Sequence, residues 1–247
     1  GGNPLDPRGF QVLGEAYLDE NRLEEAEAQF ATLVRLAPEQ PAGYVNLGLV
    51  YLRMGRYDRA EEQIQRALRI SAEDPDFGFM LATVYQLAGR ENESRELLER
   101  TLERAPRHAK SLYALANLYT QRGDTASVGR AEALVEELVE VTPANVAARL
   151  DLVELLVRHG RADRATMHLE EIRPQIPELP GDAERLLDQA LRFLRRSQTE
   201  AVATPLRRFR DFLSVTPIYQ AGIRELWGPQ GEPAGVPTLT FSPISIA

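Results

Sequence analysis

Apolar residues recur at helical spacing in pairs of short segments along most of the chain. One pair runs through Tyr44, Leu47 and Tyr51 and then, after a turn, through Ile64 and Leu68. Spacings of three and four residues place such side chains on one face of an α-helix. The pattern therefore predicts pairs of amphipathic helices. Because one pair cannot bury its own apolar face, neighbouring pairs must stack.

A motif of leucine, a small residue, two variable residues and tyrosine recurs every 34 residues. Its four clear copies begin at Leu13, Leu47, Leu81 and Leu115, and a fifth, weaker copy begins at Leu152 after an insertion. A small residue follows nine positions after each of the first three tyrosines, at Ala26, Ala60 and Ser94. A fixed period of this length is typical of a solenoid, and the small residues allow the two helices of a unit to approach closely.

The turn inside each unit carries a residue that tolerates left-handed backbone, where a helix stops. These residues are Asn21, Gly55, Gly89, Gly123 and Gly160. Proline closes most units, because it cannot continue a helix. These prolines are Pro38, Pro106, Pro143 and Pro177.

The repeated residues resemble the tetratricopeptide repeat (TPR) over roughly residues 7–179. The resemblance implies an all-α fold, a right-handed TPR superhelix (α-solenoid) in which each repeat is a helix-turn-helix hairpin. The expected organisation is five repeats within residues 1–179, at 7–40, 41–74, 75–108, 109–145 and 146–179.

Beyond the fifth repeat the period weakens, but helical spacing persists. Residues 180–217 are expected to form a degenerate sixth hairpin that caps the stack. Its second helix is expected from about Thr204, with Pro205 in the first turn, where the missing N–H costs nothing.

Residues 218–247 differ in composition, with several prolines and glycines and few charges. We expect a short helix over 218–227 and then an extended, strand-like tail. A single strand needs a sheet edge, so the tail could be donated to another copy and build a homo-oligomer or filament. The residues expected to carry this self-assembly are Trp227, Leu239, Phe241, Ile244 and Ile246. The segment also weakly resembles the link between TPR repeats and a β-propeller in bacterial secreted FG-GAP/ASPIC-type proteins, which would make the chain one module of a larger protein.

The composition excludes several kinds of chemistry. The 247 residues include no cysteine, so disulfides, thiolate metal sites and cysteine nucleophiles are absent. A formal net charge of −8 argues against nucleic acid as a partner, and no apolar run is long enough to span a bilayer. The histidines lack metal-ligand spacing, and no catalytic, metal or cofactor motif stands out. The sequence therefore favours a protein that is not an enzyme and has no cofactor, and it does not indicate a compartment.

The resemblance to TPR proteins implies a concave groove lined by the first helix of each repeat. At these positions the chain carries an apolar stripe with polar flanks. The residues expected to bind a partner are Val45, Leu49, Leu52, Arg53, Phe79, Gln86, Tyr113, Asn117, Leu150 and Glu154. Two interpretations stay open, because part of the stripe can equally be core between repeats. The leading hypothesis is a scaffold that binds an apolar segment of another protein or peptide in this groove.

Overall fold

The computed structural model describes residues 6–227. These residues form thirteen α-helices and a short 3₁₀ helix, and the described part of the chain contains no strand. The all-helical solenoid predicted from the sequence is confirmed. The chain divides into two compact units, residues 1–106 (unit 1) and 107–247 (unit 2), and each is described by itself below.

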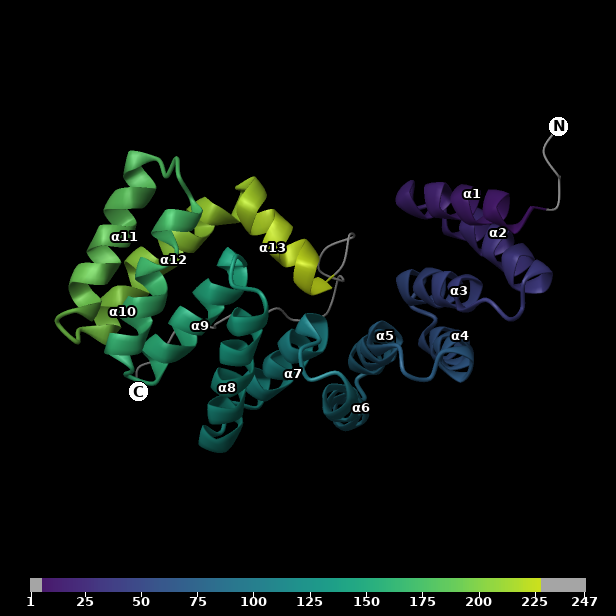
Figure 1. Ribbon diagram of the computed structural model, residues 1–247, viewed down its shortest axis with the longest axis horizontal. Coiled ribbons are helices and arrows are strands. Elements are labelled where there is room, and N and C mark those ends of the chain that lie inside the picture. Colours follow the sequence, from purple (N-terminus) through teal and green to yellow (C-terminus); the bar gives the residue numbers. More distant parts are fainter. Residues whose placement is uncertain (1–5, 228–247) are drawn as a thin grey trace. The chain divides into compact units, whose positions relative to one another are not determined.

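Unit 1 consists of three helical hairpins, each with a first and a second helix (Figure 1). The helices, in chain order, are α1 (Pro7–Asp19), α2 (Leu23–Leu36), α3 (Pro41–Arg53), α4 (Tyr57–Ile70), α5 (Pro75–Leu87) and α6 (Glu91–Arg104). Each of the second helices α2 and α4 also packs against the first helix of the next hairpin, so the apolar faces form one continuous core.

Unit 2 contains three more hairpins, α7–α8, α9–α10 and α11–α12, followed by a single helix, α13. Their bounds are α7 (Ala109–Arg122), α8 (Thr125–Val141), α9 (Val146–Arg158), α10 (Ala162–Glu170), α11 (Gly181–Leu194), α12 (Thr199–Ser214) and α13 (Pro217–Trp227). The short 3₁₀ helix, Arg173–Gln175, lies between α10 and α11.

The small residues of the motif lie where two helices touch. A methyl group added at Gly48 on α3 would lie 2.8 Å from Cγ1 of Ile64 on α4, so a larger residue there would force the Ile64 side chain to move. Ala26, Ala60 and Ser94 are each fully buried, at 0% exposure. The close approach predicted from the sequence is confirmed.

The turn residues adopt the predicted left-handed conformation. Asn21 has φ 56°, and Gly55, Gly89, Gly123 and Gly160 have φ between 67° and 76°. The α11–α12 turn uses Ser197 for the same purpose, with φ 54°. The sequence did not suggest this position, because serine is not a usual left-handed residue.

Helix α12 begins earlier than expected. It starts at Thr199, so Pro205 lies inside the helix rather than in its first turn. The proline removes the hydrogen bond that Ala201 would accept. Ala201 is exposed, which leaves its carbonyl free to bind water and lowers the cost of the interruption.

Candidate functional site

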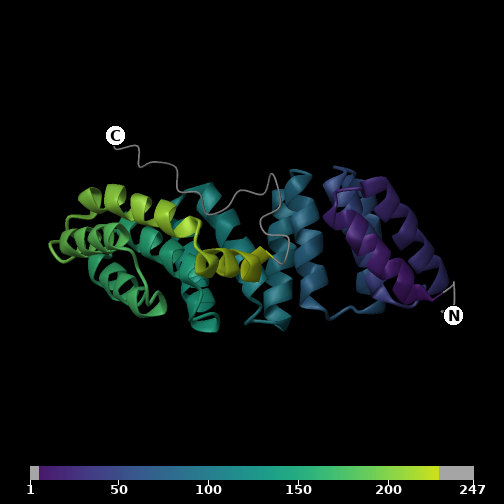
Figure 2. The same ribbon diagram turned by 90° about the horizontal axis from the view of Figure 1, so that it is seen from above.

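Helix α13 packs against α7 and α9, the first helices of two hairpins in unit 2, and against α12, which precedes it (Figures 1 and 2). Its buried residues are Tyr219, Gly222, Leu226 and Trp227, which share one side of the helix. The opposite side of α13 is exposed. An amphipathic helix laid on neighbouring helices is a recurring mode of peptide recognition, and here the chain supplies that helix itself.

The apolar part of this contact joins Trp227 to Tyr113 of α7. Their ring centroids lie 5.5 Å apart with the planes at 80°, an edge-to-face arrangement. Such pairs contribute about 0.5–1.5 kcal/mol beyond the area they bury. Burial raises the pKa of Tyr113 well above its usual value, and the nearby charge of Asp151 adds to the rise. The phenol therefore stays neutral at physiological pH.

Asn145 connects the start of α9 to α13. Its side-chain carbonyl accepts a hydrogen bond from the backbone N–H of Ala148 at 3.0 Å and caps α9. Its amide nitrogen donates to the backbone carbonyl of Gly222 at 3.0 Å and to the carboxylate of Glu225 at 2.8 Å. A methyl group at residue 222 would lie 2.5 Å from Oδ1 of Asn145. Only glycine permits so close an approach of the two helices.

Arg210 of α12 joins α13 to α9 through buried charges. Its guanidinium donates to Asp151 and Glu154 at 2.7 Å each, and to the hydroxyl oxygen of Tyr219 at 3.2 Å. Two carboxylates thus share one guanidinium, and Asp151 is only 1% exposed. The positive charge of Arg158 also acts on Glu154, so the two carboxylates face two guanidinium groups.

Burial dominates the acid–base properties of this cluster. Burial raises the pKa of both Asp151 and Glu154, although the positive charge of Arg210 opposes the rise. Burial by itself lowers the pKa of Arg210, but the charges of Asp151 and Glu154 outweigh it, so the guanidinium stays protonated. Burial also raises the pKa of Tyr219 to about 12.

Four of the groove residues expected from the sequence lie in unit 2, and all are largely enclosed. Tyr113 contacts α13 and Glu154 pairs with α12. Leu150 is 0% exposed and Asn117 is 1% exposed. The interpretation of the stripe as core is therefore favoured at Tyr113 and Leu150. The side-chain oxygen and nitrogen of Asn117 both lack a hydrogen-bond partner in the described part of the chain.

The other six lie in unit 1, on α3 and α5. Phe79 is only 6% exposed and belongs to the core. The others keep part of their surface open: Val45, Leu49, Leu52, Arg53 and Gln86. Within this group, Arg53 donates a hydrogen bond to the backbone carbonyl of Leu18 at 2.7 Å. The carbonyl oxygen of Gln86 is buried without a donor among the described residues. Together with Phe79, these five residues are called the first-helix face of unit 1.

The tail expected to drive self-assembly lies mostly outside the described residues: Leu239, Phe241, Ile244 and Ile246. The strand-like pattern lies there too. Trp227 is described, and it is 7% exposed because it packs within its own chain. In this arrangement its ring is not available to another copy.

No group of three or more histidine or acidic side chains between residues 6 and 227 is placed to hold a metal ion. No helix in that range combines the length and the apolar character needed to cross a bilayer.

Comparison with known families gives two matches, both to tetratricopeptide-repeat models, over residues 12–75 and 51–118. Residues 12–118 therefore carry tetratricopeptide repeats. No curated protein matches the sequence of the chain.

Three similar solved structures illustrate the fold. PilF of Pseudomonas aeruginosa has a TM-score of 0.63 and 14% identity, covering 87% of this chain and 95% of its own. PilW, a type IV pilus biogenesis factor, has a TM-score of 0.59 and 15% identity, covering 89% of this chain and 99% of its own. A thermophilic TPR protein of Thermus thermophilus has a TM-score of 0.55 and 22% identity, covering 62% of this chain and 83% of its own. At these identities the likeness shows the TPR fold.

Sequence reasoning missed how α13 is held. Asn145 and Arg210 stand in no recognised motif, and the repeat pattern assigns neither of them a contact with α13. One signal was present: residues 219, 222, 223, 226 and 227 are apolar or glycine at helical spacing. That spacing marks one face of α13 as buried, but it does not name the surface that buries it.

Proposed function

We propose that this protein is a non-enzymatic scaffold that binds an apolar segment of another polypeptide on the first-helix face of unit 1. The observation that carries the proposal lies in unit 2. There the first helices α7 and α9 already hold an amphipathic helix, the chain's own α13. The same repeat positions in unit 1 keep apolar surface partly open.

The chemistry of the open face indicates what it would accept. Val45, Leu49 and Leu52 lie on one side of α3 at spacings of three and four residues and are each partly exposed. Arg53 and Gln86, both partly exposed, flank these apolar residues and supply polar groups at the edge of the face. Apolar anchors with a few polar contacts suit a partner helix or extended segment with an apolar side.

The test is selection of peptides by the intact chain. A random peptide library is panned on the full-length protein, and the enriched peptides are synthesised and titrated by fluorescence anisotropy. The test variant is Leu52→Asp, and the matched control is Ile70→Asp, because Ile70 is a 40% exposed apolar residue on α4, a second helix of the same unit.

We expect the enriched peptides to be apolar. They should bind Leu52→Asp at least tenfold more weakly than the wild type, a difference of about 1.4 kcal/mol in binding free energy. They should bind the control variant as tightly as the wild type. Absence of enrichment would refute the proposal. So would equal affinity for the wild type and Leu52→Asp.

A further inference from the structure

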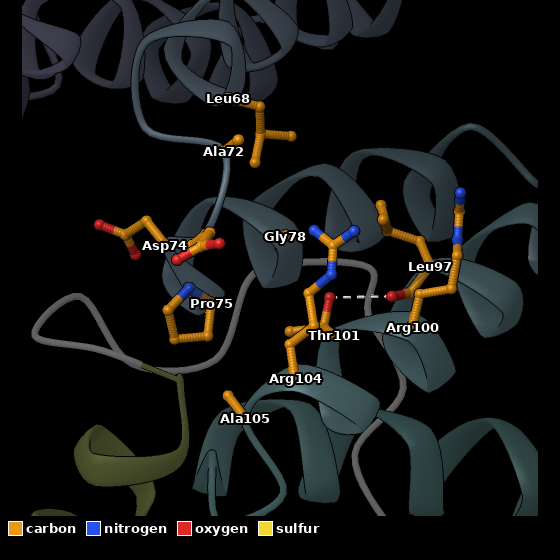
Figure 3. A pocket seen from close by; sticks show the side chains of 11 residues that line it. Leu68, Ala72, Asp74, Pro75, Gly78, Leu97, Arg100, Thr101, Arg104 and Ala105 are labelled. Carbon is orange, nitrogen blue, oxygen red and sulfur yellow. Dashed lines mark hydrogen bonds between the residues drawn. The ribbon is translucent and has the colours of Figure 1, made fainter.

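A cavity of about 260 Å³ opens in unit 1 between the end of α4, the start of α5 and the end of α6 (Figure 3). Its walls are mainly apolar, and arginine and acidic side chains stand at its rim. Its lining includes Leu68, Asp74, Gly78, Leu97, Arg100, Thr101 and Arg104. The cavity is distinct from the first-helix face, since the two share no residue.

The repeat register explains why the cavity exists. Residue 78 occupies the position held in the other clear repeats by Phe10, Tyr44 and Leu112, each 34 residues apart. Tyr44 and Leu112 are buried, at 8% and 1% exposure. A glycine at this position supplies no side chain, and Thr101 takes up only part of the space that an aromatic or aliphatic residue fills elsewhere, since a cavity remains beside Leu68 and Leu97.

The partner position on α6 has changed as well. Thr101 stands where the second repeat has Ala67, and its hydroxyl donates to the backbone carbonyl of Leu97 at 2.8 Å (Figure 3). A methyl group at residue 78 would lie 2.6 Å from that hydroxyl oxygen. Glycine and threonine together thus replace the tyrosine and alanine of the second repeat.

The size of the cavity limits its occupant. Sites for cofactors and drug-sized ligands enclose about 300–1,000 Å³, so this cavity is too small for them. It matches a single side chain, and the register identifies the kind of side chain that belongs there: the aromatic residue that the repeat lacks.

The rim adds a preference for charge. Arg100 and Arg104 of α6 are exposed at the cavity. Arg104 forms no hydrogen bond or ion pair within residues 6–227, and Arg100 donates only from Nε to the backbone carbonyl of Glu96. On the opposite side stand two acidic residues: the Asp74 carboxylate accepts the backbone N–H of Asp76 and caps α5, and Glu73 is exposed. The α6 side therefore favours a carboxylate.

We propose that this cavity binds one aromatic side chain of a partner polypeptide, with an adjacent acidic residue of that partner paired to Arg100 and Arg104. The aromatic ring would lie between Leu68 and Leu97, over the backbone of Gly78. The contact goes beyond the proposed function, because it uses a different surface and does not depend on the first-helix face.

The test is a titration of the isotope-labelled full-length protein followed by NMR. The probe is the blocked dipeptide acetyl-Phe-Glu-amide, with acetyl-Phe-Gln-amide and acetyl-Ala-Glu-amide as controls for the charge and the ring. We expect saturable shifts of the backbone amide signals of Gly78, Thr101 and Ala105, with a dissociation constant in the millimolar range that suits so small a ligand. The glutamine probe should bind about three- to tenfold more weakly, and the alanine probe should produce no saturable shift.

Two variants locate the site. Gly78→Tyr with Thr101→Ala transplants the tyrosine–alanine pair of the second repeat, fills the cavity and should abolish the shifts. Arg104→Gln leaves the cavity open and should lower the affinity for the acidic probe to that for the neutral one. The control is Arg69→Gln, which changes an exposed arginine on α4 outside the cavity. This control should leave the affinity for the acidic probe unchanged. Because Arg104 is exposed, its substitution tests the site even if the double variant fails to fold. The proposal is overturned if the acidic probe leaves these signals unshifted, if the filled variant binds it equally, or if Arg104→Gln binds it as tightly as Arg69→Gln does.

Discussion

Arg210 shows how much a single side chain contributes to the α13 contact. It is the shared partner of Asp151, Glu154 and Tyr219, and so connects three helices. Removing it would leave Asp151 as a buried charge without its ion-pair partner, and losses of this kind cost about 3–5 kcal/mol. Glu154 is the second carboxylate on Arg210, and neutralising this buried group should have the opposite effect.

We expect Glu154→Gln to stabilise the protein at neutral pH. Because burial raises the pKa of Glu154, the folded protein binds a proton there more readily than the unfolded chain. The ionised group therefore costs stability as the pH rises through the window from its unfolded pKa of about 4.5 to its higher folded pKa. The variant should gain on the order of 1 kcal/mol at pH 7.5, a rise of a few degrees in Tm. Calorimetry between pH 4.5 and 7.5 should show this gain shrinking as the pH falls.

The comparison needs a control, because other carboxylates also make stability depend on pH, with the opposite sign where their pKa is lowered. Hydrogen bonding to Arg22, for example, lowers the pKa of Glu25. Taking the difference between the variant and the wild type removes such contributions. Glu140→Gln changes an exposed glutamate of unit 2 and should give no pH-dependent difference. A lower Tm for Glu154→Gln at pH 7.5 would contradict the interpretation.

The docking of α13 depends on one close approach, between Gly222 and the Asn145 side chain. Its backbone meets Asn145 at Gly222, and the same asparagine caps α9. One side chain thus serves both the start of a first helix and the docking of α13. Trp227, the only tryptophan of the chain, lies at the end of α13 and reports on its position.

We expect Gly222→Ala to release α13 from α7 and α9. Alanine favours an isolated helix by about 1 kcal/mol over glycine, but its methyl group would collide with Oδ1 of Asn145, and such overpacking costs about 1–3 kcal/mol. The freed Trp227 should show red-shifted fluorescence and stronger quenching by acrylamide.

Two further variants separate this collision from a general effect. Ala221→Ser alters an exposed neighbour on the same helix and should leave the fluorescence unchanged. Asn145→Asp keeps the acceptor that caps α9 but loses both donors to α13, so it should reproduce the red shift. If Gly222→Ala kept the wild-type emission or raised Tm, the close approach would not be the determinant of docking.

The helical hairpins were predictable because their signals lie within one period. Each of these features determines a contact within one hairpin. They are leucine and tyrosine at fixed spacing, a small residue facing Gly48, and a left-handed residue such as Gly55 in the turn. Helix α13 lies outside the period. Its contacts join residues far apart in the chain, such as Gly222 with Asn145, 77 residues away. Helical spacing fixed which side of α13 is apolar, but the position of its binding surface depends on how the hairpins stack.

Some of the predicted groove residues are partly exposed and others are buried, and this difference also depends on contacts between distant parts of the chain. Val45 and Tyr113 occupy equivalent repeat positions, yet one is partly exposed and the other is 1% exposed. The repeat pattern assigns both to the first-helix face and cannot distinguish them. What distinguishes them in part is the ring of Trp227, which packs on Tyr113.

The molecule thus presents two first-helix faces in different states. In unit 2 the face of α7 and α9 is occupied by α13, and in unit 1 apolar residues of α3 remain partly exposed. If occupation by α13 is an ordinary helix-in-groove contact, it should be reproducible between separate molecules. Covalent connection only raises the effective concentration of α13 near its surface.

We therefore expect a chain truncated after Thr216 to bind a synthetic peptide of residues 217–227. The free peptide must fold on binding, and so short a helix is marginal in water, so an affinity in the micromolar range or weaker is expected by titration calorimetry. The full-length protein should bind the peptide at least tenfold more weakly, because its own α13 competes. A peptide carrying Gly222→Ala should lose affinity through the collision with Asn145. Equal binding by the full-length and truncated chains would place the peptide elsewhere. A truncated chain that keeps its helical circular dichroism but ignores the peptide would mean that α13 is an integral part of the core, and α13 could then no longer serve as the pattern for a partner of unit 1.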